Sequence, residues 1–355
     1  MPKIIGIETT LPAYRYAQST LRDRVIELTA PKDSRLFQAV FNRSSIEHRY
    51  SVLPDFTVDS DQHTLFSTEK VMGLDARQKV FEKESVILST ESSINLLNRL
   101  EIEPKEITHL ITVSCTGLTA PGLDVLLIEQ LGLNDDIVRI GVNFMGCHAA
   151  FQALRMAGLF TQTMPTAKVL VVSVELCSLH FQPDISEDYI IANALFGDGC
   201  ASCVVVDDSV DKPGLVLEEM YTKQLRKTSS KEMAWKVSEK GFLMKLSAYL
   251  PQILEANLKE ELQSFFIESF RETVDTWCVH PGGKNILQAV AKSFSLPLDQ
   301  LHDSFETLRN YGNMSSATIL FVLKRLFDNP QEQTVAMMGL GPGITVEACK
   351  ARYVV

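Results

Sequence analysis

The sequence lacks an apolar run long enough to span a membrane, which takes about 20 residues. It also lacks an excess of basic residues: 34 Lys and Arg stand against 44 Asp and Glu, for a net charge of −10. A nucleic-acid-binding protein needs a basic face, so this balance argues against one. The first residues, Met1 to Glu8, are typical of a strand and carry no secretion signal. We therefore expect a cytoplasmic protein with no membrane span and no nucleic-acid partner.

Cysteine is too sparse for a disulfide scaffold, because seven residues are scattered through 355. Most of them are expected to be small buried side chains in a reducing compartment. Cys200 and Cys203 have the spacing of half a zinc site, but no second pair follows and a strand-like run comes directly after them. Structural zinc needs four ligands, so no metal is expected.

No low-complexity linker divides the chain, and the clearest break is the polar, turn-rich stretch 206–214. A helix is predicted over 83–99 and a strand over 109–114, and this pair is echoed by a helix over 252–271 and a strand over 276–279. Strands alternating with helices indicate an α/β layered fold. We expect two duplicated lobes, an N-terminal lobe over 1–210 and a C-terminal lobe over 211–355.

Cys147 follows a β-like apolar run that ends at Met145-Gly146, and a helical pattern begins after it. The first turn of a helix has unpaired N–H groups and a positive dipole end. Such a position favours a thiolate, which is the nucleophilic form of cysteine. His148 comes next, but neighbours on a helix face different directions, so we do not take it as the catalytic base.

His280 and Asn313 occupy the corresponding turns of the second half. A histidine close to a cysteine stabilises the thiolate, and an asparagine amide donates a hydrogen bond to a developing oxyanion or enolate. Each residue alone has an ordinary explanation in core packing or turn chemistry. Together they predict an acyl-transfer site in which the nucleophile comes from one lobe and its partners come from the other.

Five motifs follow one another in the chain: Gly146-Cys147, Leu195-Phe-Gly-Asp-Gly199, His280-Pro-Gly-Gly283, Tyr311-Gly-Asn-Met-Ser-Ser-Ala317 and Gly339-Leu-Gly-Pro-Gly343. The set closely resembles the type III polyketide synthases, the chalcone synthase-like enzymes of the thiolase superfamily, from Phe41 to the C-terminus. The resemblance implies a five-layered αβαβα thiolase-like fold and a homodimer.

The resemblance also implies roles for the three candidate residues. Cys147 would take an acyl group from a CoA thioester, while His280 and Asn313 would hold the malonyl-CoA carbonyl during decarboxylation. Two preorganised donors are what the developing negative charge requires. Acyl-CoA and malonyl-CoA would be substrates, and no cofactor is expected.

Several residues are predicted to line the substrate cavity by the same resemblance. Phe196 matches a gatekeeper aromatic, with core packing as the alternative. Met244 stands where plant enzymes have a second gatekeeper phenylalanine. Trp235 stands at a nearby position that is glycine in chalcone synthases, although it could equally pack at a surface or an interface. The remaining candidates are Cys177, His180, Ser315, Gly341 and Pro342. Cys177 and His180 replace threonines of the plant enzymes, and we expect cavity lining there because further metal ligands are missing.

The expected CoA mouth is less basic than in the plant enzymes. Arg43 remains, while Leu36 and Ala39 stand at the other two basic positions. Lys284 either contacts a phosphate or is a solvated lysine at a helix start. An acyl carrier protein as the acyl donor would need fewer phosphate contacts, so the choice between CoA and a carrier protein stays open. Ala120 replaces a methionine that reaches the partner's cavity in plant dimers, which leaves open whether the partner shapes the pocket.

The leading prediction is an iterative synthase of bacterial type that takes an aliphatic acyl starter and closes an α-pyrone or a resorcinol/phloroglucinol-type ring. A ketoacyl synthase III-type enzyme, which performs a single extension, shares the Cys, His and Asn. A catalytically silent scaffold with the thiolase fold is the third hypothesis. The complete Tyr311–Ala317 and Gly339–Gly343 motifs favour the iterative enzyme.

Overall fold

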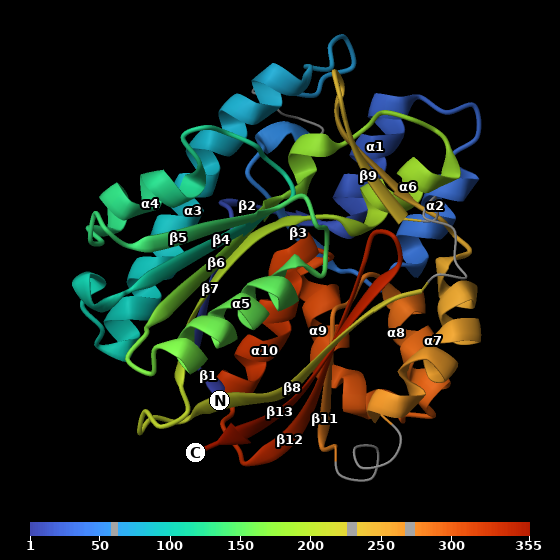
Figure 1. Cartoon of the computed structure of the whole chain (residues 1–355). Coiled ribbons are helices and arrows are strands. Elements are labelled where there is room, and N and C mark those ends of the chain that lie inside the picture. The colour runs from blue at the N-terminus through green and yellow to red at the C-terminus, as the bar shows by residue number, and fades with distance from the viewer. Residues whose placement is uncertain (58–62, 226–232, 267–273) are drawn as a thin grey trace.

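One mixed sheet of nine strands runs through the part of the chain that the computed structural model describes, residues 1–57, 63–225, 233–266 and 274–355 (Figure 1). In spatial order its strands are β11 (Thr276–Val279), β12 (Gln333–Gly341), β13 (Thr345–Val354), β8 (Gly214–Gln224), β1 (Pro2–Thr10), β7 (Asp198–Asp207), β6 (Val169–Leu176), β4 (His109–Ser114) and β5 (Val138–Asn143). Two smaller sheets pair β2 (Tyr14–Ala17) with β3 (His48–Ser51) and β9 (Met233–Ser238) with β10 (Gly241–Leu246).

The large sheet contains the predicted duplication. In the first half β4 runs parallel to β6, β6 antiparallel to β7, and β7 antiparallel to β1. In the second half β11, β12, β13 and β8 repeat these three relations in the same order. The halves join where β1 meets β8, through the pairs Lys3↔Val216 and Ile4↔Leu215. The sheet is therefore two similar units joined along a short seam.

Helices cover both outer faces and fill the space between the halves. They are α1 (Gln18–Thr29), α2 (Arg35–Arg43), α3 (Leu74–Leu100), α4 (Leu123–Leu131), α5 (Ala149–Thr163), α6 (Glu187–Leu195), α7 (Leu250–Phe266), α8 (Lys284–Phe294), α9 (His302–Tyr311) and α10 (Thr318–Asp328). Figure 1 shows α5 and α10 side by side in the middle, with α3 and α4 on one side and α7 and α8 on the other. When each half of the large sheet is counted as a layer, the order is helix, sheet, helix, sheet, helix. This order confirms the predicted thiolase-like fold.

The buried side chains form three clusters, one for each helical layer. The central cluster joins α5 and α10 to both halves of the sheet, and the outer clusters lie under α3 and under α7 with α8. Strands alternate between them: Val335 and Met337 of β12 face the centre, while Ala336 and Met338 face outward. Successive strand residues point to opposite faces, and a strand covered on both sides is apolar throughout.

Helix boundaries differ from the predictions where polar residues are buried. The helix predicted over 83–99 begins earlier, at Leu74, and its first turns contain Arg77, which is buried and donates to the carbonyls of Leu179 and Phe181. The helix predicted over 252–271 is α7, and residues 267–271 of that prediction lie outside the described part. In the described residues, no helix combines the length and the apolarity that a membrane crossing requires.

Candidate active site

Cys147 lies in the turn between β5 and α5, two residues before the helix begins at Ala149. The turn needs glycine at position 146, where φ is +84° and an added Cβ would lie 2.3 Å from Pro342 Cδ. The Gly146 N–H donates to the Cys115 sulfur at 2.9 Å. The first lobe thus places Cys147 against a loop of the second.

His280 directly follows β11, and its N–H donates to the Met338 carbonyl at 2.7 Å. Its side chain is 1% exposed, and neither ring nitrogen has a hydrogen-bond partner among the described residues. Buried polar atoms are normally paired, so an unpaired imidazole in a cavity is available to a reacting group. The predicted candidate therefore has both ring nitrogens free for chemistry.

Asn313 follows α9 and forms an isolated parallel β-bridge with Phe196. Its Oδ1 accepts the Ser315 N–H at 2.9 Å, which leaves the amide nitrogen as the free donor end. That nitrogen lies beside the Cys147 thiol, and its bond to the Gly282 carbonyl is long, at 3.4 Å. Such a bond is weak, so the donor is available to a substrate oxygen.

One narrow chamber of about 30 Å³ brings the three candidates together. Five further predicted residues also line it, namely Phe196, Trp235, Met244, Ser315 and Pro342. The rest of the wall is mostly aliphatic, with Leu246, Leu250, Ile286 and Leu340. The chamber is thus an apolar space with a thiol, an imidazole and an amide at one end.

Burial acts against the thiolate that we expect at this helix start. Burial raises the pKa of Cys147 to about 12, although hydrogen bonds from Ser315 and Asn313 act in the other direction. Because α5 begins only at Ala149, Cys147 precedes the first turn, to which the dipole effect is confined. Burial also lowers the pKa of His280 to about 3. Each group alone is neutral, and only a charge pair in the same chamber would stabilise the thiolate.

Gly341 has other contacts than expected, and His148 lies where expected. Gly341 does not border the described chamber; an added Cβ there would lie 1.9 Å from His148 Nδ1, so this glycine makes room for the His148 ring. His148 is also absent from the chamber wall, as expected from its helix position, and burial lowers its pKa to about 4. Both residues support the turn without facing the reacting space.

A second chamber of about 50 Å³ lies behind Phe196, Trp235 and Met244, which line both spaces. Cys177 and His180 border this second chamber, with Tyr16, Leu21 and Val25 on its far side. His180 is held at both nitrogens: Nε2 donates to the Thr116 carbonyl at 2.7 Å, and Nδ1 accepts the Phe242 N–H at 3.0 Å. Burial lowers its pKa to about 3. Cys177 and His180 are lining residues here, and no metal-binding group of three or more ligands occurs in the described chain.

The outer mouth is a cavity of about 580 Å³ that shares Leu246, Leu250 and Ile286 with the Cys147 chamber. Arg43 and Lys284 line it, together with Leu36 and Ala39. Glu187 adds a negative charge to the same wall. The two predicted cations, Arg43 and Lys284, therefore lie on the wall of one cavity. Ala120 lines a separate cavity, of about 350 Å³, with Leu118 and Thr119.

Sequence reasoning missed two buried residues beside the nucleophile. Cys115 lines the chamber with Cys147. Glu175 is 0% exposed and accepts from the backbone N–H of Cys115 and the hydroxyls of Thr116 and Ser316, so it ties the two lobes together. Burial raises the pKa of Glu175. A charged residue inside the apolar run of β6 was the available signal.

Cys200 and Cys203 do not form half a metal site. They lie three residues apart on β7, so they point to opposite faces and belong to different core clusters. All seven cysteines are free and buried.

Comparison with known proteins identifies the family. The N-terminal domain of chalcone and stilbene synthases matches residues 2–209, and the C-terminal domain matches residues 218–355. The chain belongs to the chalcone and stilbene synthase family. It is thus a type III polyketide synthase, an acyltransferase that carries out Claisen condensations.

Relatives of this type III polyketide synthase occur in bacteria and in a brown alga. The alpha-pyrone synthesis polyketide synthase-like Pks18 of Mycobacterium tuberculosis is 31% identical over 97% of this chain and 89% of its own. A putative chalcone synthase of Bacillus subtilis is 30% identical over 98% of this chain and 97% of its own. The crystal structure of PKS-I from the brown alga Ectocarpus siliculosus superposes with a TM-score of 0.94, at 28% identity over 99% of this chain and 98% of that one.

Proposed function

We propose that this type III polyketide synthase extends an acyl starter on Cys147 by repeated decarboxylative condensation with malonyl-CoA and closes the product to an α-pyrone. One observation carries the proposal: Cys147, His280 and Asn313 share a buried chamber that adjoins a wide mouth on one side and a second chamber on the other. The mouth suits the carrier, and the inner space suits the growing chain.

Loading starts with proton transfer from the Cys147 thiol to the unpaired imidazole of His280. The resulting ion pair stabilises itself in the dry chamber, where either charge alone is disfavoured. The thiolate attacks the carbonyl of the starter thioester, a new C–S bond forms and the C–S bond to CoA breaks. The leaving CoA thiolate takes the proton from His280, which returns to its neutral form.

Extension uses the same imidazole as a donor. A neutral His280 has one N–H, and Asn313 offers its amide N–H, so both can bind the thioester oxygen of malonyl-CoA. The carboxylate leaves as CO₂ and the electrons of the broken C–C bond form an enolate, whose charge these donors stabilise. The enolate carbon attacks the acyl carbon, the bond to Cys147 breaks, and the chain passes to CoA two carbons longer. Transfer back to Cys147 begins the next round.

The closed inner wall and the name of one relative support a short chain and an α-pyrone. Trp235 and Met244 stand opposite each other on β9 and β10 and close the chamber behind the nucleophile. An α-pyrone forms when an enol oxygen attacks the thioester carbonyl: a C–O bond forms, the C–S bond breaks, and the thiol leaves with the proton. The relative named for alpha-pyrone synthesis supports this product over a resorcinol or phloroglucinol ring. The apolar far side of the second chamber, with Leu21 and Val25, supports an aliphatic starter.

The test combines acyl-CoA starters of increasing chain length with ¹³C-labelled malonyl-CoA and determines product masses. Two labelled units with the loss of one water relative to the open acid support the proposal, because closure to a phloroglucinol-type ring takes three units. A single two-carbon extension would instead favour the ketoacyl synthase III-type activity. Cys147→Ala provides the matched blank, and a parallel reaction with an acylated carrier protein determines whether CoA is the preferred donor. If no starter or carrier leads to malonyl consumption, the chain is a scaffold.

We also propose that the chain acts as a homodimer. β5 is the outer strand of the sheet, and large apolar side chains on or near this edge are exposed, among them Val138 at 47% and Leu118 at 48%. An unpaired apolar edge invites association with a second copy. Light scattering after gel filtration should give twice the chain mass of 39.6 kDa, and a single-chain mass would contradict the dimer.

A further inference from the structure

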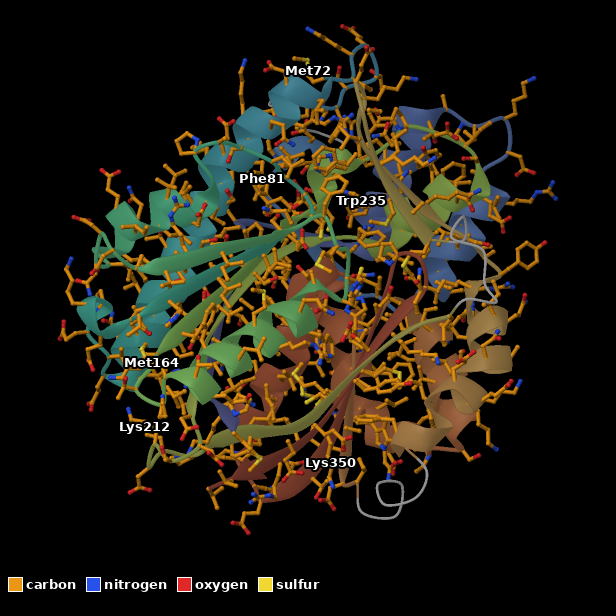
Figure 2. The ribbon with its side chains drawn as sticks, viewed as in Figure 1. Met72, Phe81, Met164, Lys212, Trp235 and Lys350 are labelled. Atoms are coloured by element: carbon orange, nitrogen blue, oxygen red, sulfur yellow. The ribbon has the colours of Figure 1, made fainter. Side chains whose placement is uncertain are left out.

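The indole N–H of Trp235 is buried without an acceptor in the described protein. Trp235, labelled in Figure 2, lies on β9. It stands directly opposite Met244 of β10 and borders both inner chambers. Buried N–H groups are normally hydrogen-bonded, and an exception calls for an explanation such as an absent ligand. The residue that carries this unpaired donor stands in the wall of the reacting cavity.

The neighbours of Trp235 cannot supply the missing acceptor. Its ring packs edge-on against His180 and Phe242, with centroids 6.0 and 6.4 Å away. Both nitrogens of His180 are already engaged, with the Thr116 carbonyl and the Phe242 N–H. The His180 and Phe242 rings stack at 4.3 Å with an interplanar angle of 6°. This fixed pair holds the indole in place, and no described residue accepts a hydrogen bond from its N–H.

The reaction itself produces the suitable partner. Every extension adds a ketone oxygen to a chain that occupies a space lined mainly by apolar groups such as Phe196, Met244 and Leu246. The polar side chains at the nucleophile end are needed for the thioester that reacts there. A ketone away from the thioester therefore meets few donors, and Trp235 is one that faces both chambers.

We infer that the Trp235 indole N–H donates a hydrogen bond to a ketone or enol oxygen of the polyketide chain and so positions the chain for ring closure. The inference rests on the proposed function and assigns Trp235 a specificity-determining role beyond that of a bulky wall. No proton is transferred to or from the indole. The bond holds the chain folded, so that its enol oxygen reaches the thioester carbonyl before water does.

The first experiment removes the N–H and keeps the shape of the side chain. Trp235→3-benzothienylalanine, introduced by codon suppression, replaces the indole nitrogen with sulfur. Starter loading on Cys147 and malonyl-CoA decarboxylation are measured in parallel, so that the product ratio is compared per loaded chain. The ratio of cyclised product to open-chain hydrolysis product should fall by about fivefold or more, as expected for one lost hydrogen bond. An unchanged ratio, with loading and decarboxylation intact, would overturn the inference while leaving the proposed function standing.

The second experiment observes the N–H directly and does not depend on a folded variant. The chain has two tryptophans, so uniform ¹⁵N labelling gives two indole signals, with Trp277 of the outer core as the reference. A non-hydrolysable analogue of a β-ketoacyl thioester should move the Trp235 indole proton signal downfield. The matching analogue of equal length without the β-ketone should not. Equal shifts with both compounds would overturn the inference. Failure of the wild type to load a starter or decarboxylate malonyl-CoA would instead defeat the proposed function.

Discussion

The two ends of the inner cavity are built from different parts of the fold. At the nucleophile end, Cys147, His280 and Asn313 sit in turns anchored to the nine-stranded sheet or to the helices packed on it. At the opposite end, Trp235 and Met244 belong to a two-stranded sheet that shares no pairing with the large one. Bond-making groups are thus fixed by the core, while the wall that limits the product is carried by a separate hairpin. Substitutions at the two ends should affect different steps.

The largest effect is expected at the nucleophile. Cys147→Ala should lower product formation by about a thousandfold or more, as the loss of other catalytic nucleophiles does. Malonyl-CoA decarboxylation should persist, because His280 and Asn313 still bind the thioester oxygen. Product and CO₂ release are measured in the same reaction. Cys115→Ala, in the same chamber, is the control, and full product from Cys147→Ala would refute the nucleophile assignment.

Asn313→Ala should reduce decarboxylation by about a hundredfold, the usual effect of losing one oxyanion donor. Starter loading should change much less, because the thiol and imidazole remain. Asn310→Ala, on α9 and outside the chamber wall, serves as the control. Equal losses in loading and decarboxylation would show that Asn313 supports the structure and does not act on the malonyl carbonyl.

The stability of the protein should fall in mild acid because of buried neutral histidines such as His180. An unfolded imidazole takes up a proton near pH 6.5, whereas His180 in the fold does so only near pH 3. Below pH 6.5 the unfolded state therefore binds more protons, and by pH 5 this single group removes about 2 kcal/mol of unfolding free energy. Guanidinium unfolding at pH 7.5, 6 and 5 measures the slope.

His180→Gln should be less stable at pH 7.5 but lose less stability on acidification than the wild type. His302→Gln, at the exposed start of α9, is the control and should keep the wild-type slope. If His180→Gln also keeps that slope, His180 is not a source of the acid sensitivity.

The smallest effect is expected at the mouth. Lys284→Gln should raise KM for malonyl-CoA by about threefold and leave kcat unchanged, since one partly solvated ion pair contributes little. Lys292 lies on the same helix, is paired with Glu255 and does not line the cavity. Lys292→Gln should therefore behave as the wild type. A change in kcat alone would place Lys284 in the chemistry and not at the carrier.

The sequence supported the fold and the meeting of the three candidates because these depend on local patterns. The strands predicted over 109–114 and 276–279 are β4 and β11, and each candidate residue follows the end of a strand or helix with glycine or proline beside it. The duplicated order of elements predicted that the turns of the two halves would converge.

Burial, and contacts between segments that are distant in the sequence, were not predictable in the same way. The raised pKa of Cys147 arises from the surrounding protein, which no local pattern reports. Gly341 was expected to face substrate, but its role is to admit the ring of His148 from the other lobe. The pairing of His180 with Thr116 and Phe242 likewise joins segments that are distant in the chain.

The central claim is that several extensions take place on Cys147, and one measurement tests it directly. The reaction is quenched in acid during turnover, digested with trypsin and analysed for acylated peptides. Cleavage after Arg139 and Arg155 places Cys147 and its neighbour Cys115 on separate peptides. The account predicts starter, one-unit and two-unit chains on the Cys147 peptide. Chains on the Cys115 peptide, or only the unextended starter on Cys147, would contradict it.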